Sequence, residues 1–279
     1  MTIVYLNGEY VDQEEARVPV IDRGLLHGFG LFETLRVYGG VPFRLGAHLD
    51  RLYASALELG FSLPASREEL EEAIPEVVRR CSLKDARVRA TVTAGDAATF
   101  QEGSALVTAV PIEGLPPEIY EEGVRLISTP LDKGVSLARH KTTNFMAKML
   151  AHKQATEVGA FEAIFRNPSG RISECATSNI FVAKEGKLRT PLVSEGILPG
   201  ITREIVIRLA AEQGIPASEG LLENEDLFRA DEAFITASVK EIVPVVRVGD
   251  RTIGSGRPGP LTRRLLQAYR SLVQQECPE

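Results

Sequence analysis

The chain has few cysteines, and none of them is paired at the spacing of a metal site. Its three cysteines, Cys81, Cys175 and Cys277, are far apart and form no CxxC motif, and its four histidines form no HExxH motif. Sparse cysteines of this kind are typical of a reducing compartment, and zinc sites need clustered thiolate or imidazole ligands. We therefore expect no zinc site and no metal cofactor.

The sequence also lacks a long apolar run and a basic leader. No stretch of 18 apolar residues occurs, and the opening MTIVYLNGEYVDQEEARV is neither strongly basic nor continuously apolar. Membrane-spanning helices and secretory signals need such features. We expect a cytoplasmic protein that does not bind membranes.

Positive charge is not in excess. The chain has 32 basic and 38 acidic residues, which gives a formal net charge of -6. Binding to nucleic acids and to anionic lipids depends on clustered positive charge. A nucleic-acid partner is therefore not expected.

The composition is that of an ordinary globular protein, and the chain is long enough to form two hydrophobic cores. The chain has 279 residues, of which 44% are hydrophobic and 25% charged. This length favours two domains. A loop rich in glycine and proline, PIEGLPPE, follows the apolar strand SALVTAV and is the best candidate for a linker. We place the domain boundary near residue 117, with one domain over 1–117 and the other over 118–279.

The first half alternates in ways that predict strands. The Asn7-Gly8 pair interrupts IVYLNGEYVD and is typical of a tight hairpin turn. LFETLRVY is a further strand that ends at two glycines. In ARVRATVTAG the residues Arg87, Arg89 and Thr91 share one face, which could line a cleft. Between these strands, AHLDRLYASALELG has the apolar spacing of a helix that ends at Gly60.

The second half mixes strands and helices. Strands are predicted for GVRLIST, FEAIFRN, SNIFVAK, DEAFITAS and EIVPVVRVG, and helices for 143–159, 199–214 and 259–274. The hairpin NIFVAK-EG-KLRTP favours antiparallel pairing. We therefore expect an α+β fold and not a doubly wound sheet.

Three local features could carry chemistry. Lys141, one of only eight lysines, precedes a long amphipathic helix in HKTTNFMAKMLA. It could be an imine-forming amine or an ordinary solvated lysine. Glu174 lies among small polar residues in RISECATSNIF, where it could face a ligand or solvent. Gly200-Ile201-Thr202 begins a predicted helix whose free N–H groups would favour phosphate, although Pro-Gly is also common before helices.

Taken together and in this order, the motifs resemble the class IV aminotransferases, the fold type IV pyridoxal-phosphate enzymes. The family includes branched-chain aminotransferases, D-amino-acid transaminases and 4-amino-4-deoxychorismate lyases. The similar segments run over nearly the whole chain and are YLNGEYV, FETLRVYGGVPFRLGAHLDRL, KTTN, SECATSNIFV, ILPGITR, SVKEIVPV and GRPGPLTRRLL.

The resemblance implies a two-domain fold, with a small N-terminal α/β domain and a larger C-terminal pseudo-barrel domain, and the cofactor pyridoxal 5'-phosphate. It assigns Lys141 as the catalytic Schiff-base lysine and Glu174 as the carboxylate that faces the pyridine nitrogen. It also implies a homodimer or a larger even-numbered oligomer. The remaining cofactor contacts that it implies are Arg51, Ser178, Asn179, Leu198, Ile201, Thr202, Ser238 and Val239.

The substrate residues are less uniform within the family. Arg89 aligns with an arginine of branched-chain enzymes and is our choice for a carboxylate anchor, with Phe32 and His27 near the substrate. The alternative for Arg89 is an ion pair with a surface acid, and His27 could simply pack. Phe145 lacks the hydroxyl of a tyrosine that is found in several branched-chain enzymes, and Ala94 replaces an arginine of D-amino-acid transaminases.

The resemblance implies an aminotransferase that moves an amino group between an amino acid, of D or branched-chain type, and a 2-oxo acid. Two alternatives stay open at this point. The FETLR and RVRATVTAG segments are also compatible with 4-amino-4-deoxychorismate lyase, which forms 4-aminobenzoate and pyruvate. The other alternative is a cofactor-binding protein without turnover, although a carboxylate placed for the ring nitrogen would then have no purpose.

Overall fold

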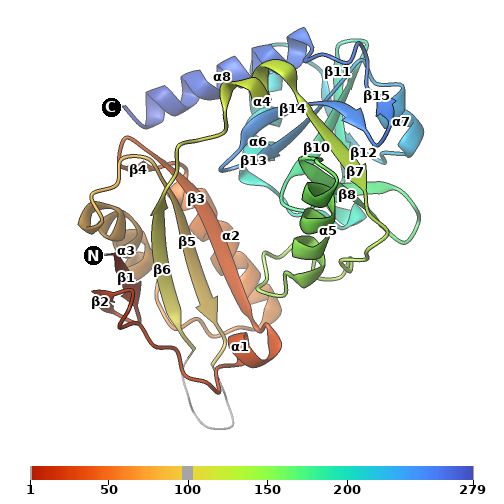
Figure 1. Cartoon of the computed structure of the whole chain (residues 1–279). Helices are drawn as coiled ribbons and strands as arrows, with labels where there is room; N and C mark the ends of the chain where they lie inside the picture. Colours follow the sequence, from red (N-terminus) through yellow and green to blue (C-terminus); the bar gives the residue numbers. More distant parts are fainter. Residues whose placement is uncertain (1, 96–102, 279) are drawn as a thin grey trace. The chain divides into compact units, whose positions relative to one another are not determined.

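The computed structural model describes residues 2–95 and 103–278, which form two compact units (Figure 1). The first unit comprises the described parts of Met1–Glu113, His140–Asn144 and Val273–Glu279, and the second comprises Gly114–Arg139 and Phe145–Leu272. Each unit has its own sheet and hydrophobic core. The domain boundary near residue 117 stays a prediction.

The first unit is built on a six-stranded antiparallel sheet in the order β2-β1-β6-β5-β3-β4. Its strands are β1 Ile3–Leu6, β2 Glu9–Asp12, β3 Gly30–Tyr38, β4 Val41–Pro42, β5 Ala86–Thr93 and β6 Ala105–Pro111. Its helices are α1 Arg23–His27, α2 Leu45–Leu59 and α3 Arg67–Arg80. Helices α2 and α3 pack on one face of the sheet, and their apolar side chains form the core with it (Figure 1).

Local sequence explains these elements. The predicted hairpin forms because Asn7 and Gly8 adopt φ angles of 50° and 92°, which a two-residue turn requires. Helix α2 ends at Gly60 in the left-handed conformation, as predicted. Helix α3 was not predicted, although Ser66 and Glu69 form a capping box at its start.

The second unit is built on a curled nine-stranded sheet in the order β12-β11-β10-β13-β14-β7-β8-β9, with β15 paired to β14. Its strands are β7 Val124–Ser128, β8 Glu162–Arg166, β9 Ile172–Cys175, β10 Asn179–Lys184, β11 Lys187–Pro191, β12 Ala217–Gly220, β13 Glu232–Ala237, β14 Glu241–Val248 and β15 Arg251–Thr252. Its helical elements are α4 Pro117–Glu122, α5 Met146–Glu157, η1 Val193–Glu195, α6 Ile201–Glu212, α7 Asn224–Phe228 and α8 Pro260–Glu276, which continues into the first unit.

The α+β prediction is confirmed, but pairing in the second sheet is not purely antiparallel. The hairpin of β10 and β11 is antiparallel, as predicted, whereas β7 pairs in parallel with β8 and with β14, and β11 pairs in parallel with β12. Helix α5 lies between β7 and β8 in the chain, and α6 lies between β11 and β12. These helical crossovers permit parallel neighbours, which a short hairpin loop cannot connect.

Helix α5 differs from the amphipathic helix that the sequence predicts. It begins at Met146, and of its side chains only those of Ala151 and Ala155 are buried, whereas Met149 and Leu150 are exposed. Its start nevertheless lies close behind the Lys141 segment, as the pattern indicates.

The three cysteines are free thiols. Within residues 2–95 and 103–278, no cluster of three or more metal-ligating side chains is present. Over the same ranges, no helix is both long enough and apolar enough to cross a bilayer.

Candidate functional site

In the first unit, the backbone of β3 positions Lys141. The amide of Phe32 donates to the Lys141 carbonyl at 2.9 Å, and the amide of Thr143 donates to the Gly30 carbonyl at 2.8 Å. The side-chain hydroxyl of Thr143 also donates to Gly28. The segment that carries the lysine is therefore fixed on the strand even though it lies outside the regular sheet.

The ring of Phe32 connects Lys141 to Arg89. The Lys141 Nζ lies 4.7 Å from the ring centroid, and the Arg89 guanidinium carbon lies 3.6 Å from it. Arg89 also donates through Nε to the Thr91 hydroxyl at 3.1 Å. Burial and the nearby charge of Arg87 lower the pKa of Arg89. Arg89 thus lies over an aromatic ring beside Lys141.

Arg51 is held by a buried carboxylate that adjoins Phe32 in the chain. Its Nε and Nη2 donate to the two oxygens of Glu33 at 2.8 Å and 2.6 Å. The His48 Nδ1 lies 2.8 Å from the same carboxylate, and burial lowers the pKa of His48, so the neutral ring donates its Nδ1–H. Burial alone would raise the pKa of Glu33, but the charge of Arg51 and the hydrogen bond from His48 outweigh it and hold that pKa far below its usual range.

In the second unit, Glu174 is a buried and ionised carboxylate. It lies in β9, and its side chain is only 3% exposed. Its Oε1 lies 2.9 Å from the Lys148 Nζ and 3.1 Å from the Lys133 Nζ, and its Oε2 accepts from the amide of Leu198 at 2.9 Å. Burial would raise the pKa of Glu174, but the two lysine charges and the amide hydrogen bond lower it below its ordinary value.

Leu198, Asn179 and the start of α6 are joined by short contacts. The Asn179 side-chain amide donates to the Leu198 carbonyl at 2.9 Å. A Cβ atom at Gly200 would collide with the Asn179 amide oxygen, so any other residue there would displace the Asn179 side chain. Half-buried Leu198 thus contributes both of its backbone polar groups to this arrangement.

Helix α6 begins at Ile201, as the sequence predicts, and both Ile201 and Thr202 are buried. The N-cap residue is Gly200, which has no side chain to cap the first amides. Nearby on β13, the hydroxyl of Thr236 is buried without a hydrogen-bond partner among the described residues. An uncapped helix start is a site where an anion can accept hydrogen bonds.

Glu162 connects the two turns that contain Ser178 and Ser238. Its carboxylate accepts from the Ser178 hydroxyl at 2.8 Å, from the backbone and hydroxyl of Thr177, and from the Lys240 Nζ at 2.9 Å. Ser238 and Val239 precede that lysine in the turn between β13 and β14. Burial would raise the pKa of Glu162, but Lys240 and the hydroxyl and amide donors lower it.

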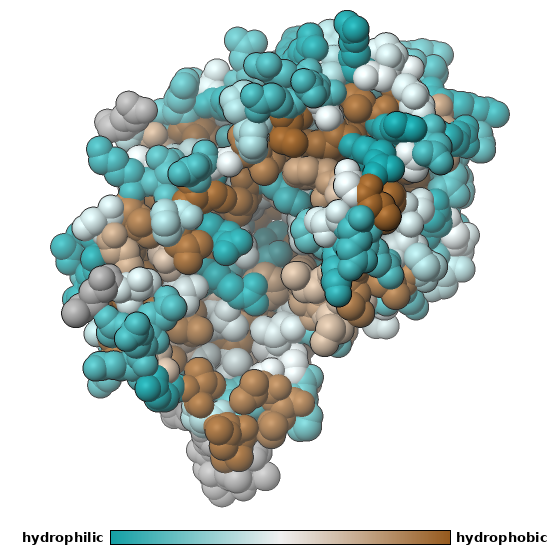
Figure 2. Space-filling view, in the orientation of Figure 1, coloured by the Kyte–Doolittle hydropathy of each residue, from teal (hydrophilic) through white to brown (hydrophobic). Residues whose placement is uncertain are grey.

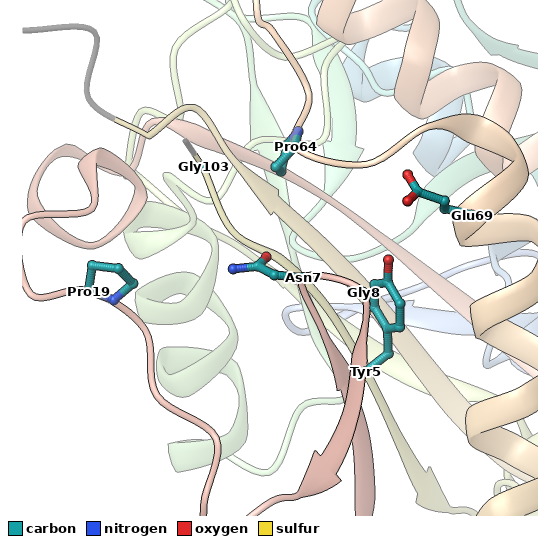
Figure 3. A pocket seen from close by; sticks show the side chains of 7 residues that line it. All are labelled: Tyr5, Asn7, Gly8, Pro19, Pro64, Glu69 and Gly103. Atoms are coloured by element: carbon teal, nitrogen blue, oxygen red, sulfur yellow. The ribbon is translucent and has the colours of Figure 1, made fainter. Parts of the chain in front are cut away.

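Two features of the first unit lie outside these clusters. His27 is exposed at the end of α1, and its predicted role stays a prediction. A hollow of about 440 Å³ contains none of the predicted site residues (Figure 3). It is lined by Tyr5, Asn7, Gly8, Pro19, Pro64, Glu69 and Gly103.

The hydrogen-bonding partners of several of these side chains were not identified from the sequence. These are His48 for Glu33, Lys133 and Lys148 for Glu174, and Glu162 for Ser178. In FETLR and HLDRL, the apolar surroundings of Glu33 and His48 were the only local sign that these side chains would be buried.

The chain is similar to known proteins over nearly its whole length. Residues 30–248 match the family described as Amino-transferase class IV. The chain is 39% identical to a putative branched-chain-amino-acid aminotransferase of Methanocaldococcus jannaschii, over 96% of each chain. It is 35% identical to a D-alanine aminotransferase of Bacillus licheniformis, over 98% of each chain. A branched-chain amino acid aminotransferase of T.th., solved with pyridoxamine 5'-phosphate, is similar in structure, with a TM-score of 0.92, 32% identity, and coverage of 99% of this chain and 95% of that one.

Proposed function

We propose that this chain, which belongs to the class IV aminotransferase family, moves an amino group from a branched-chain amino acid to a 2-oxo acid. The family gives the aminotransferase reaction and its cofactor, pyridoxal 5'-phosphate. The observation that carries the choice of donor is the 39% identity, over 96% of both chains, to the relative from Methanocaldococcus jannaschii. The D-alanine aminotransferase relative supports D-amino acids as the second candidate.

The residues present fit such a cofactor. Pyridoxal phosphate has three reactive or charged parts. Its aldehyde reacts with an amine, its basic ring nitrogen pairs with a carboxylate, and its phosphate binds hydrogen-bond donors. The chain offers Lys141, the ionised Glu174 and the start of α6 behind Gly200. Near that start, the Thr236 hydroxyl has no hydrogen-bond partner within residues 2–95 and 103–278. The donor set therefore matches each reactive part of the molecule.

When bound, this cofactor supplies an electron sink for the pair released as the substrate Cα–H bond breaks. We assign Lys141 the attachment of the cofactor and the transfer of that proton. Glu174 is assigned to the ring nitrogen, because an ionised carboxylate stabilises a proton there. The orientation of Glu174 by the Leu198 amide supports this role.

Phosphate binding is assigned to backbone amides and one arginine. Two charge-assisted hydrogen bonds to Glu33 fix the direction of Arg51, which suits it to a phosphate. The Ser178 turn and the turn before Lys240 are held by the common carboxylate of Glu162. The proposed set of cofactor contacts is Arg51, Lys141, Glu174, Ser178, Asn179, Leu198, Ile201, Thr202, Ser238 and Val239.

For the substrate carboxylate we propose Arg89, supported by its stacking on Phe32 beside Lys141. Phe32 and His27 complete the proposed substrate contacts. A guanidinium held over an aromatic ring loses little freedom when it binds a planar carboxylate.

The donor can be identified by titrating the purified holoenzyme with L-leucine, D-alanine, D-glutamate and (R)-1-phenylethylamine while recording its visible spectrum. L-Leucine should convert the lysine-bound cofactor to its amine form, because transamination leaves the amino group on the cofactor. Conversion by D-alanine alone would favour the second candidate. If no donor changes the spectrum and 4-aminobenzoate forms from 4-amino-4-deoxychorismate, the enzyme is a lyase.

We also propose a homodimer and a cytoplasmic location, the latter supported by the free thiols. The dimer is supported by an apolar surface around α1, defined as Val18, Val20, Ile21, Leu25, Leu26 and Phe29, whose side chains are all exposed. Figure 2 shows hydrophobic residues gathered where α1 lies in Figure 1. Contiguous apolar patches on soluble proteins commonly mark interfaces.

The double variant Leu25→Glu, Leu26→Glu is expected to shift the protein toward monomer, because it places two charges in this apolar surface. These side chains are 65% and 56% exposed, so the fold of the chain itself should tolerate the change. Sedimentation velocity measures the result, with Leu57→Glu, a substitution at an exposed position of α2, as the control. A wild-type protein that sediments as a monomer would refute the dimer.

A further inference from the structure

Two lysine ammonium groups lie within hydrogen-bonding distance of the single carboxylate of Glu174. Lys133 and Lys148 both point an ammonium group at its Oε1, and their side chains are only 5% and 18% exposed. Lys133 lies in the segment between β7 and α5, and Lys148 lies near the start of α5. Two separate segments of the second unit therefore each bring one lysine to the same oxygen.

Within hydrogen-bonding distance of Glu174, the positive charges outnumber the single negative one. One carboxylate faces two ammonium groups, while the Leu198 amide occupies Oε2. Asp132 also acts on Lys133, more weakly than Glu174 does. Burial lowers the pKa of Lys133, and the charge of Lys148 lowers it further, although Glu174 and Asp132 oppose them. Lys148 alone would neutralise Glu174, and Lys133 places a second ammonium group at the same oxygen while it also donates to the Gly196 carbonyl.

We propose that Lys133 and Lys148 are positioning residues that compete with the cofactor ring nitrogen for Glu174 and thereby set how firmly that nitrogen keeps its proton. The proposal rests on the role assigned to Glu174 above. The carboxylate stabilises a protonated ring nitrogen, and each ammonium group opposes it. A unit charge about 6 Å away, at an effective dielectric constant of about 20, shifts a proton equilibrium by about 2 pH units.

The test is a pH titration of the holoenzyme loaded with pyridoxal phosphate that carries ¹⁵N in the ring. The ¹⁵N chemical shift reports whether the nitrogen is protonated. Lys148→Met keeps much of the side-chain volume and removes the charge. The pH midpoint of ring-nitrogen protonation should therefore rise by about 1 to 2 pH units. Lys148→Arg keeps the charge and should restore the wild-type midpoint.

Lys153→Met is the matched control. Lys153 lies in the same helix, its side chain is 71% exposed, and it pairs with Glu157 and not with Glu174. Its loss should leave the midpoint unchanged. Lys133→Met provides a second variant that should shift the midpoint in the same direction as Lys148→Met.

Affinity gives an independent readout. The dissociation constants of pyridoxal phosphate and of its analogue with CH in place of the ring nitrogen are measured for each variant. The ratio of the dissociation constant of the analogue to that of pyridoxal phosphate should be roughly 10-fold larger for Lys148→Met than for wild type. This factor corresponds to a shift of about one pH unit. A structural role alone would weaken both ligands equally.

The outcomes separate this inference from the proposed function. The proposed competition would be overturned if the ring-nitrogen midpoint stayed unchanged in both methionine variants. It would also be overturned if both variants lost cofactor binding, because the lysines would then only stabilise a buried carboxylate. A wild-type protein that binds no pyridoxal phosphate would instead overturn the function on which the inference rests.

Discussion

Replacing Lys141 with alanine is expected to abolish the visible absorbance of the lysine-bound cofactor and to lower kcat for transamination by roughly 10⁴-fold. The side chain is assigned both the attachment of the cofactor and the proton transfer, and alanine can do neither. The fold should survive, because β3 holds this segment through backbone hydrogen bonds that the substitution keeps. Absorbance spectroscopy and steady-state kinetics with L-leucine measure the two effects.

Lys187→Ala is the control, because Lys187 is an exposed lysine of β11. It should leave both the spectrum and kcat unchanged. Circular dichroism establishes that the Lys141 variant is folded. A folded Lys141→Ala protein that retains the band and its activity would show that another lysine binds the cofactor, and the assignment of Lys141 would then be wrong.

The sequence predicted best those features that depend on neighbouring residues. Asn7-Gly8 determines its own hairpin, and Gly60 ends its own helix, so both could be located without the rest of the chain. Gly200 likewise marks the start of α6. Helix α3 shows that a local signal can still be overlooked, because its capping box at Ser66 is plain in the sequence.

Contacts between distant segments could not be derived in this way. Lys148 and Glu174 are 26 positions apart, and Glu162 and Lys240 are 78 apart. No spacing rule connects such pairs, since the connection depends on how the strands are ordered in the sheet. The family resemblance identified Glu174 as a cofactor contact, but only the structure shows the two lysines that face its carboxylate.

Glu33 illustrates the same limit. It was predicted only as a member of the FET strand, yet it is fully buried and bonded to both Arg51 and His48. Alternation along β3 places Glu33 on the face of Leu31 and Leu35, which is the core face beneath α2. A carboxylate there is tolerated only because Arg51 and His48 satisfy it.

Glu33→Gln is therefore expected to lower the free energy of unfolding by about 3 kcal/mol at pH 7, because it leaves the Arg51 charge buried without its counter-ion. The effect should depend on pH. The pKa of Glu33 is lower in the folded chain than its ordinary value of 4.5, so its stabilisation is fully present above that value and is lost as the pH falls below it. The difference between wild type and variant should accordingly shrink in acid.

Urea unfolding between pH 3 and 8 measures this difference, provided that both proteins unfold reversibly. Glu71→Gln is the control, since Glu71 pairs with Arg67 on the exposed side of α3 and its loss should change little at any pH. A difference between wild type and Glu33→Gln that stays constant down to pH 3 would mean that packing, and not charge, makes Glu33 important. A difference that narrows in acid would identify the ionised carboxylate as the group that holds Arg51 in the orientation proposed for phosphate binding.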